Sequence, residues 1–295
     1  MLVNMKEMLA DAEKHNYAIG SLNTPNLETL RAVIGAAEEL GCPIIINHAQ
    51  GHEPVVALEV IAPLMKLYAE NAKVPVAMHI DHGLDIDFCM RAVRAGFTSI
   101  MCDRSAYPLE ENIALTKAFV DLVRPLGITV EAELGAMPNN MPSCVPGQEQ
   151  SDLSDLTKYF TRVEEAEKFA RATGVEVLAI SIGTVHGMYT EKSNLDIQRI
   201  KDIKKAVEGT GTYLGIHGCS GTEPDQVVAA INAGIRKINY FTAMDTGITP
   251  AIQQMIDGYE GRPLNYSLMV NVAMEELKKG AKQALELFMT CKKSW

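Results

Sequence analysis

Several histidines of this sequence stand at the ends of short apolar segments, close to glycine. His79 and His82 close the segment MHIDHG, His186 lies in GTVHG and His217 opens HGCSG. Each of them alone could be a packing or capping residue, because imidazole is versatile in hydrogen bonding. Three imidazoles that converge and leave a fourth position open form a catalytic zinc site. We therefore predict a metal site built from His82, His186 and His217.

Carboxylates accompany these histidines. Asp81 precedes His82, where it could pass a proton to or from a substrate hydroxyl or, alternatively, orient one of the histidines. Asp103, Glu131 and Glu133 are expected at the same rim. Because buried carboxylates need partners, we expect these three to contact the metal, its ligands or a monovalent cation such as Na⁺ or K⁺.

Donors for an anion occur near the end of the chain. Gly218, Cys219, Ser220 and Gly221 precede a predicted helix, and backbone amides at a helix start point at bound anions. Further donors end the next apolar segment: Asn239, Tyr240, Phe241 and Thr242. Neighbouring loops of this kind predict a phosphate site.

Eight apolar segments alternate with segments of helical spacing, and this pattern indicates the architecture. The apolar segments lack polar alternation, which is typical of strands buried on both faces. They cover residues 18–23, 43–49, 76–82, 99–104, 129–135, 177–183, 213–218 and 237–242. An open doubly wound sheet could use the same alternation, but no phosphate-binding fingerprint follows the first strand. We predict an α/β fold, a (β/α)8 TIM barrel.

Three segments lie outside the repeat. We expect residues 5–15 to form an N-terminal helix that caps the barrel floor. Residues 136–157 form a long polar loop, and long loops at this face of a barrel are usually functional. Residues 272–289 form a helical tail that could be an interface in a homodimer or homotetramer. The whole chain, 1–295, is predicted to be a single domain.

Composition excludes several classes of function. The 295 residues carry a formal net charge of −10, which argues against nucleic acid and anionic membranes as partners. Apolar residues make up 47% of the chain, enough to exclude disorder. The six cysteines lack a CxxC pair, and the start lacks a secretory signal, so we expect reduced thiols and a cytoplasmic location.

Together these motifs resemble those of the class II, zinc-dependent ketose-bisphosphate aldolases, which include fructose- and tagatose-bisphosphate aldolases. The resemblance rests on YAIG followed by Asn23, and on HIDHG, VEAELG, IGTVHG, HGCSG and KIN. It implies that His82, His186 and His217 hold Zn²⁺ and that Asp81 transfers the proton of the substrate's C4 hydroxyl. It also implies that Asp103 and Glu133 receive the zinc in a resting position. Residues implied to bind the substrate are Asn23, Gly187, Gly218, Cys219, Ser220, Asn239, Tyr240, Phe241 and Thr242.

The implied reaction is the reversible cleavage of a ketose 1-phosphate or 1,6-bisphosphate to dihydroxyacetone phosphate and an aldehyde, with Zn²⁺ stabilising the enediolate. Two alternatives remain, a metal-dependent barrel hydrolase and a non-catalytic sugar-phosphate binder. A Schiff-base aldolase is disfavoured, because Lys237 opens the last predicted strand at the far end of the barrel.

The sequence departs from the family pattern on the aldehyde side. Fructose-bisphosphate members carry a basic residue that holds the distal phosphate, and Asp245 occupies that position here. Its carboxylate would repel a phosphate. Tyr240 and Phe241 favour a less polar or unphosphorylated aldehyde. The loop 136–157 lacks the usual Gly-Gly-x-Glu-Asp pattern, which leaves Glu149 as the candidate for a second proton transfer. Many members have a serine before Gln-Gly after the second strand, where this chain reads His48-Ala49-Gln50-Gly51-His52. The roles of the two histidines are undecided.

Overall fold

Eight parallel strands form the centre of the computed structural model, which describes residues 1–140, 151–187 and 194–288. Each strand pairs with the next along the chain, and β8 pairs with β1, so the sheet closes into a barrel. The strands are β1 (Ile19–Asn23), β2 (Ile44–Ala49), β3 (Val76–Gly83), β4 (Ser99–Cys102), β5 (Thr129–Leu134), β6 (Val177–Ile180), β7 (Tyr213–Ile216) and β8 (Ile235–Tyr240). The predicted (β/α)8 TIM barrel is therefore confirmed.

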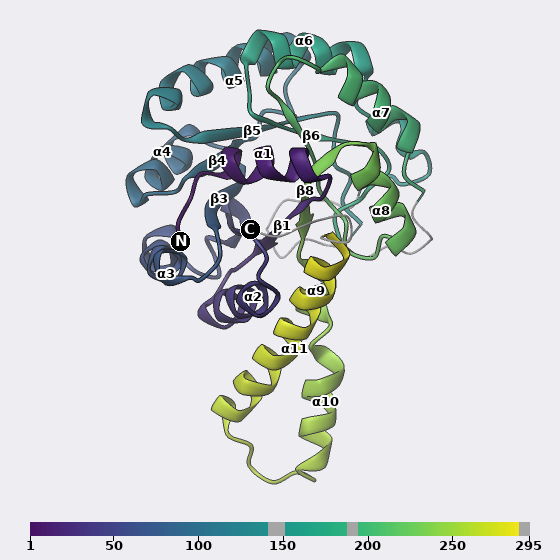
Figure 1. Cartoon of the computed structure of the whole chain (residues 1–295). Coiled ribbons are helices and arrows are strands. Elements are labelled where there is room, and N and C mark those ends of the chain that lie inside the picture. Colours follow the sequence, from purple (N-terminus) through teal and green to yellow (C-terminus); the bar gives the residue numbers. More distant parts are fainter. Residues whose placement is uncertain (141–150, 188–193, 289–295) are drawn as a thin grey trace.

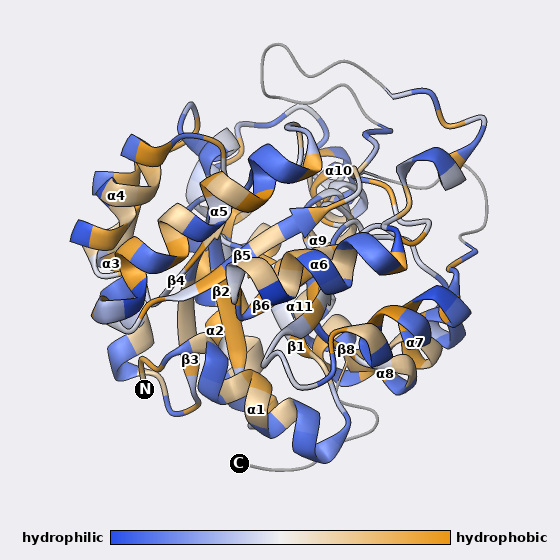
Figure 2. Ribbon diagram, turned by 90° about the horizontal axis from the view of Figure 1, so that it is seen from above, coloured by the Kyte–Doolittle hydropathy of each residue, from blue (hydrophilic) through white to orange (hydrophobic). Residues whose placement is uncertain are grey.

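Helices surround the barrel, with their apolar faces against the strands and their polar faces outward (Figures 1 and 2). They are α2 (Leu27–Leu40), α3 (Leu58–Asn71), α4 (Ile86–Ala95), α5 (Leu109–Val123), α6 (Val163–Thr173), α7 (Ile197–Ala206) and α8 (Pro224–Ala233), with short 3-10 turns η1 (Gln50–His52), η2 (Arg124–Leu126) and η3 (Leu156–Tyr159). Local signals fix their ends. In α4, the Asp85 side chain accepts a hydrogen bond from Phe88 N (3.0 Å), and Gly96 ends the helix with φ of 88°.

Helix α1 (Met5–His15) lies across one end of the barrel (Figure 1). Its buried side chains, Met5, Met8, Leu9 and Ala12, join a cluster with Ile19, Ile45, Ala77 and Val177, which point inward from four strands. This cluster fills the amino-terminal end of the barrel with apolar atoms. Polar chemistry is thereby left to the opposite end, where the strands finish.

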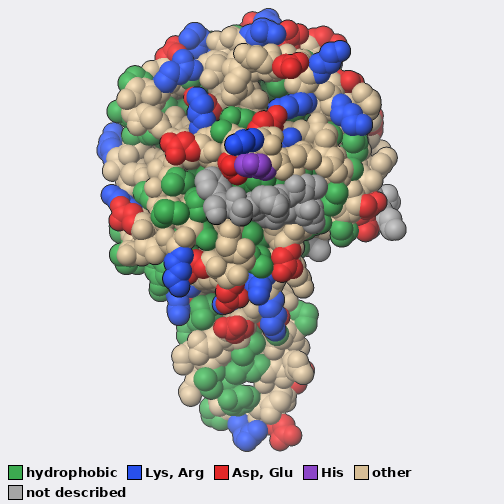
Figure 3. Space-filling view, in the orientation of Figure 1, with side chains coloured by type: hydrophobic (Ala, Val, Ile, Leu, Met, Phe, Trp, Pro, Cys, Tyr) green, Lys and Arg blue, Asp and Glu red, His purple; other side chains and the backbone are tan. Residues whose placement is uncertain are grey.

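The last three helices leave the ring. They are α9 (Thr242–Thr246), α10 (Thr249–Gly258) and α11 (Tyr266–Phe288). The carboxyl-terminal half of α11 packs against the barrel, where Phe288 O accepts a hydrogen bond from Ala18 N (3.1 Å). The other half projects together with α10 as an arm (Figure 1), and green hydrophobic side chains show at its surface (Figure 3). No described helix is both long and apolar enough to cross a membrane.

Several strands end earlier than their apolar segments. β4 ends at Cys102, β6 at Ile180 and β7 at Ile216, because the residues that follow leave the ladder to form loops at the barrel mouth. β8 is shifted in the other direction: it begins at Ile235, directly after the glycine that ends α8. Lys237 is therefore the third residue of its strand, whereas the sequence analysis had placed it at the start.

Candidate active site

The structure brings the three predicted metal-site histidines together at the carboxyl-terminal mouth. His82 is the last residue but one of β3, while His186 and His217 follow β6 and β7. One ring nitrogen from each lies within 4.8 Å of the corresponding nitrogens of the other two. The ring centroids of His82 lie 5.2 Å from those of His186 and 4.8 Å from those of His217. Segments separated by more than a hundred residues thus supply one set of converging imidazoles.

An unusual backbone turns His82 into the site. In a regular strand, consecutive side chains point to opposite faces, so Asp81 and His82 could not both face the cavity. His82 has φ of 49°, in the left-handed region, and the register of β3 against β4 shifts between Ile80 and Gly83. Such a conformation costs roughly 1–3 kcal/mol in a residue other than glycine, and such residues cluster at functional sites. The break in alternation places a carboxylate and an imidazole side by side.

Backbone contacts hold the loop of His186. Its N–H donates to Pro138 O (2.8 Å), and its carbonyl accepts from Asn140 N (3.0 Å). The start of the long polar loop therefore runs beside this histidine. Gly218 has φ of 67°, and a Cβ there would lie 2.3 Å from Val185 O. Only glycine lets the loop after β7 approach the loop of His186 so closely.

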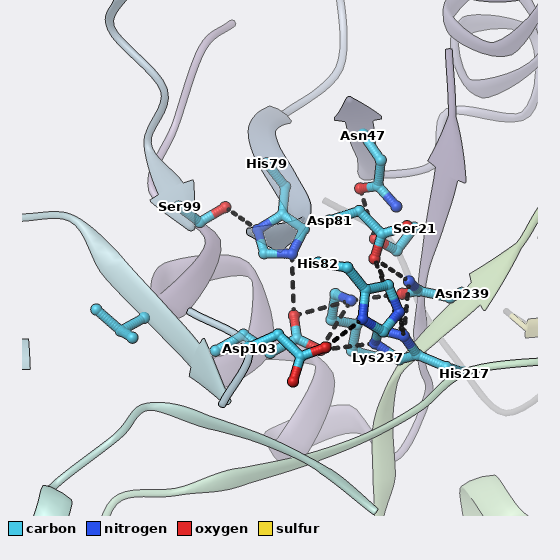
Figure 4. Close-up of polar contacts among 12 residues, drawn as sticks. Ser21, Asn47, His79, Asp81, His82, Ser99, Asp103, His217, Lys237 and Asn239 are labelled. Atoms are coloured by element: carbon cyan, nitrogen blue, oxygen red, sulfur yellow. Dashed lines mark hydrogen bonds and ion pairs between the residues drawn. The ribbon is translucent and has the colours of Figure 1, made fainter. Parts of the chain in front are cut away.

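The ring partners of His82 and His217 determine which nitrogens are free. His82 Nδ1 lies 2.7 Å from Asp103 Oδ2, and His217 Nε2 lies 2.9 Å from Glu131 Oε1 (Figure 4). Each ring donates an N–H to its carboxylate, which leaves His82 Nε2 and His217 Nδ1 facing each other. Two lone pairs directed at one another repel unless a proton or a metal ion lies between them. The donor set fits zinc, which binds neutral imidazoles that carboxylates orient from behind.

The electrostatics of the site also favour a positive charge at this point. Burial disfavours the charged form of His82, but Asp81 and Asp103 raise its pKa to about 10. Burial likewise opposes the charge of Asp81, but His82, His217 and Lys237 hold its pKa well below the usual range. Burial, with the neighbouring His82 and His217, lowers the pKa of His186 to about 3. The neutral ring of His186 offers the lone pair that a metal needs.

A second set of ligand atoms shares His82. Atoms of His82, Asp103 and Glu133 lie within 4.8 Å of one another. Burial, reinforced by the charge of Asp103, raises the pKa of Glu133 to about 8. Asp103 is further held by Ser105, which donates its backbone N–H and its hydroxyl to Asp103 Oδ1. The two sets together offer two positions for one cation, with His82 between them.

Asp81 is fixed by asparagines beside the two ring nitrogens that face each other. Its Oδ1 accepts from Asn239 Nδ2 (2.8 Å) and its Oδ2 from Asn23 Nδ2 (3.1 Å). Oδ1 lies 3.9 Å from His217 Nδ1 and 4.0 Å from His82 Nε2 (Figure 4). A substrate atom bound next to the two rings would therefore lie within reach of the Asp81 carboxylate, as proton transfer requires.

Buried residues missed by the sequence analysis support these asparagines. Asn47 Nδ2 donates to Asn23 Oδ1 (3.0 Å), and Ser21 donates to Asn47 Oδ1 (2.8 Å). A signal existed for Asn47, which is a fully buried amide that interrupts the apolar segment IIINHA. Without the strand pairing, nothing identified Ser21 as its partner.

Glu131 lies deeper in the barrel than predicted, and Lys237 lies nearer the site than predicted. Lys237 Nζ is 2.8 and 3.1 Å from the two carboxylate oxygens of Glu131 and donates to Asn239 Oδ1 (2.5 Å). Glu131 also lies 3.1 Å from His79 Nε2, and the other nitrogen of His79 meets Ser99 Oγ at 2.9 Å. The prediction that Lys237 stands at the far end of the barrel was therefore wrong. It lies below the site, in an ion pair with the carboxylate that orients His217.

The predicted anion-binding loops lie side by side. Phe241 N donates to Ser220 Oγ (3.4 Å), which joins the loops after β7 and β8. Cys219 and Ser220 are buried, whereas Gly218, Tyr240, Phe241 and Thr242 are half-buried. Gly187 is also half-buried, next to His186, with φ of 94°. Glu149 falls outside the described residues.

Comparisons with known proteins agree with this architecture. A family model described as fructose-bisphosphate aldolase class-II matches residues 3–293. The chain is 34% identical over 261 residues to a fructose-bisphosphate aldolase of Geobacillus stearothermophilus, covering 86% of each chain. It is 35% identical over 268 residues to a probable fructose-bisphosphate aldolase of Bacillus subtilis (strain 168), covering 88% of this chain and 90% of that one. The X-ray structure of the YdjI aldolase from Escherichia coli K12 superimposes with a TM-score of 0.82 at 33% identity, covering 98% of this chain and 97% of the other. This chain therefore belongs to the class II fructose-bisphosphate aldolase family.

Proposed function

We propose that the protein is a zinc-dependent aldolase that reversibly cleaves a ketose 1-phosphate or 1,6-bisphosphate to dihydroxyacetone phosphate and an aldehyde. The observation that carries this proposal is the convergence of His82, His186 and His217 within 4.8 Å, with Asp81 beside them. A zinc ion held by these rings supplies Lewis-acid polarisation and positive charge for the substrate oxygens. Family membership supports the aldolase reaction over hydrolysis.

Asp81 performs the proton transfer at C4 in this proposal. During cleavage the C4 hydroxyl proton passes to its carboxylate, and the C4 oxygen becomes the aldehyde carbonyl. The electron pair of the C3–C4 bond stays on the dihydroxyacetone phosphate half. Asn23 and Asn239 hold both oxygens of Asp81, so the proton acceptor needs no reorganisation when substrate binds.

The loops after β6, β7 and β8 bind the dihydroxyacetone phosphate half. Gly187, Gly218, Cys219 and Ser220 present amides and a hydroxyl, which suit a phosphate inside an otherwise acidic molecule. The residues from Asn239 to Thr242 complete this side. Asp103 and Glu133 are proposed to receive the zinc in a resting position, which their shared cluster with His82 supports. A monovalent cation at the rim carboxylates Asp103, Glu131 and Glu133 stays a prediction.

The aldehyde side is proposed to differ from that of fructose-bisphosphate members. Asp245, on α9, stands where those members carry a basic residue for the distal phosphate. Tyr240 and Phe241 add apolar surface nearby. These features favour ketose 1-phosphates, which release an unphosphorylated aldehyde, over bisphosphates.

We also propose that one barrel domain works as part of a cytoplasmic homodimer or homotetramer. The arm formed by α10 and the start of α11 supports this assembly. α10 buries none of its residues within the chain, and Ile256, Tyr266 and Leu268 are exposed on the arm. Exposed apolar side chains gathered on a projecting element are typical of a subunit interface.

A cleavage panel tests the reaction. Ketose 1-phosphates and fructose and tagatose 1,6-bisphosphates are supplied, and dihydroxyacetone phosphate is followed with a coupled dehydrogenase. In parallel, exchange of the C3 proton of dihydroxyacetone phosphate is measured in D₂O, which reports the half-reaction that needs no aldehyde. We expect both activities, with ketose 1-phosphates preferred. Hydrolysis of esters or amides without either activity would favour the hydrolase, and inactivity in all assays the non-catalytic binder.

A further inference from the structure

His52 occupies a position at the barrel mouth that the steps above do not use. It lies in η1, directly after β2, and only 9% of its surface is exposed. Its ring meets the edge of the Phe241 ring at a centroid distance of 5.5 Å, and the ring of His48 lies 6.1 Å away. Phe241 follows β8, and β1 lies between β8 and β2 in the barrel. The two side chains therefore meet across the end of β1.

The η1 turn is held rigidly. Gln50 Oε1 accepts from Leu84 N (2.7 Å) and Asp85 N (3.2 Å), and Gln50 Nε2 donates to Asp85 Oδ2 (3.0 Å). His52 O accepts from Val56 N at 3.0 Å. These contacts tie the turn to the loop that follows His82. The ring of His52 is thus preorganised relative to the metal-site histidines.

The hydrogen-bonding capacity of this ring is unused within the described chain. No described residue hydrogen-bonds to the imidazole ring of His52, and its Nδ1 is shielded from water as well. An unpaired buried polar nitrogen costs on the order of 1–3 kcal/mol, so buried polar groups are nearly always paired. Such a group beside a reaction site indicates a partner that arrives with the ligand.

The position of His52 indicates which part of the ligand it meets. Asn23, at the end of β1, hydrogen-bonds to Asp81, the proposed proton acceptor for the C4 hydroxyl. The metal-site histidines come from β3 and from the loops after β6 and β7, so none of them comes from β1, β2 or β8. That leaves the space past Asp81, over β1, where His52 and Phe241 meet, for substrate atoms beyond C4. Burial lowers the pKa of His52. The negative charge of Asp81 acts in the opposite direction and is the smaller effect.

Resting on the proposed function, we infer that His52 and Phe241 form the aldehyde pocket and select an unphosphorylated, hydroxylated aldehyde. The imidazole hydrogen-bonds to a hydroxyl of the aldehyde chain, and the Phe241 ring packs against its carbon atoms. A second phosphate dianion is disfavoured, because the nearby carboxylate of Asp81 repels it. His52 is accordingly a specificity-determining residue and takes no part in bond breaking.

The test compares wild type with His52→Phe, which keeps the size of the ring and removes its nitrogens. Substrates are ketose 1-phosphates and their 5-deoxy and 6-deoxy analogues, and kcat/KM is measured for each. A hydrogen bond to a neutral partner, worth about 1 kcal/mol, corresponds to a preference of roughly five- to tenfold for one hydroxylated substrate over its deoxy analogue. We expect His52→Phe to abolish that preference and His52→Gln, which keeps a donor and an acceptor, to retain part of it.

Two controls separate the possible failures. C3 proton exchange on dihydroxyacetone phosphate should be unchanged in His52→Phe, which verifies an intact fold and metal site. His15→Phe makes the same change on α1 at the opposite end of the barrel and should leave the preference unchanged. An unaltered preference in His52→Phe, or a loss of exchange together with cleavage, would overturn the inference. Absence of exchange and cleavage in wild type would refute the proposed function itself and, with it, this inference.

Discussion

His82 Nε2 and His217 Nδ1 lie 3.0 Å apart, although 135 residues separate them in the chain. The other nitrogen of each ring meets a carboxylate, that of Asp103 behind His82 and that of Glu131 behind His217. Asp103 follows β4 and Glu131 lies on β5, so the pair forms only when β3, β4, β5 and β7 come together in the closed barrel. A cation bound between these rings should therefore stabilise the closed barrel.

Removal of one ring should remove the metal. His217→Ala leaves two imidazoles, so we expect the purified protein to lose its stoichiometric zinc. Wild type should gain about 2.7 kcal/mol of stability when zinc is present at a hundred times its Kd, and the variant much less. Mass spectrometry measures the zinc content, and thermal unfolding with and without zinc measures the gain in stability. His15→Ala is the control, and equal zinc content in wild type and His217→Ala would contradict the assignment.

Asp81→Asn should separate the two halves of the reaction. The amide cannot take the C4 hydroxyl proton, so we expect kcat for cleavage to fall about 10²- to 10⁴-fold. Proton exchange at C3 of dihydroxyacetone phosphate does not involve C4 and should remain within a few-fold of wild type, as should zinc content. Asp121→Asn, on the exposed face of α5, serves as the control. A variant that cleaves at the wild-type rate would exclude Asp81 as the proton acceptor.

The buried pair of Lys237 and Glu131 should matter for stability. Lys237→Met leaves a fully buried carboxylate without its cation, which typically costs about 3–5 kcal/mol. Lys117→Met breaks an exposed ion pair with Asp121 (2.7 Å) and should cost less than about 1 kcal/mol. Urea unfolding of the two variants measures the difference. Equal midpoints would mean that the buried pair contributes no more than the exposed one.

Charges on the arm should dissociate the oligomer. We expect the double variant Tyr266→Asp and Leu268→Asp to run as a monomer in light scattering, because two charges would be buried in the interface. The matched control places the same charges on Leu122 and Leu126, which are also exposed apolar residues but lie on the barrel side. A wild-type monomer, or an unchanged mass in the arm variant, would exclude the arm as the interface.

Much of the fold followed from local pattern. Apolar segments such as IIINHA and VLAI have the length and the lack of alternation of strands buried on both faces. Because all such strands in a barrel end at one mouth, the strand-end positions grouped the histidines, and the glycine beside each of His82, His186 and His217, with the family resemblance, singled out these three. Strand ends were less predictable, since residues such as Arg104 and Gly183 continue the apolar segment but leave the ladder.

The deeper contacts were beyond the sequence. The ion pair of Lys237 with Glu131 depends on the successive registers of β5, β6, β7 and β8, which no local pattern encodes. The same holds for the chain from Ser21 through Asn47 to Asn23, which crosses between β1 and β2. The left-handed backbone of His82 is a strained conformation that the surrounding fold imposes, so residue preferences argue against it.

The most direct measurement is the rate of dihydroxyacetone phosphate release from a ketose 1-phosphate by protein dialysed against EDTA. We expect the rate to fall to background and to return in proportion to added ZnCl₂, reaching its full value at one equivalent per chain. A full rate in excess EDTA, in protein shown to be free of metal, would contradict a reaction centred on His82, His186 and His217.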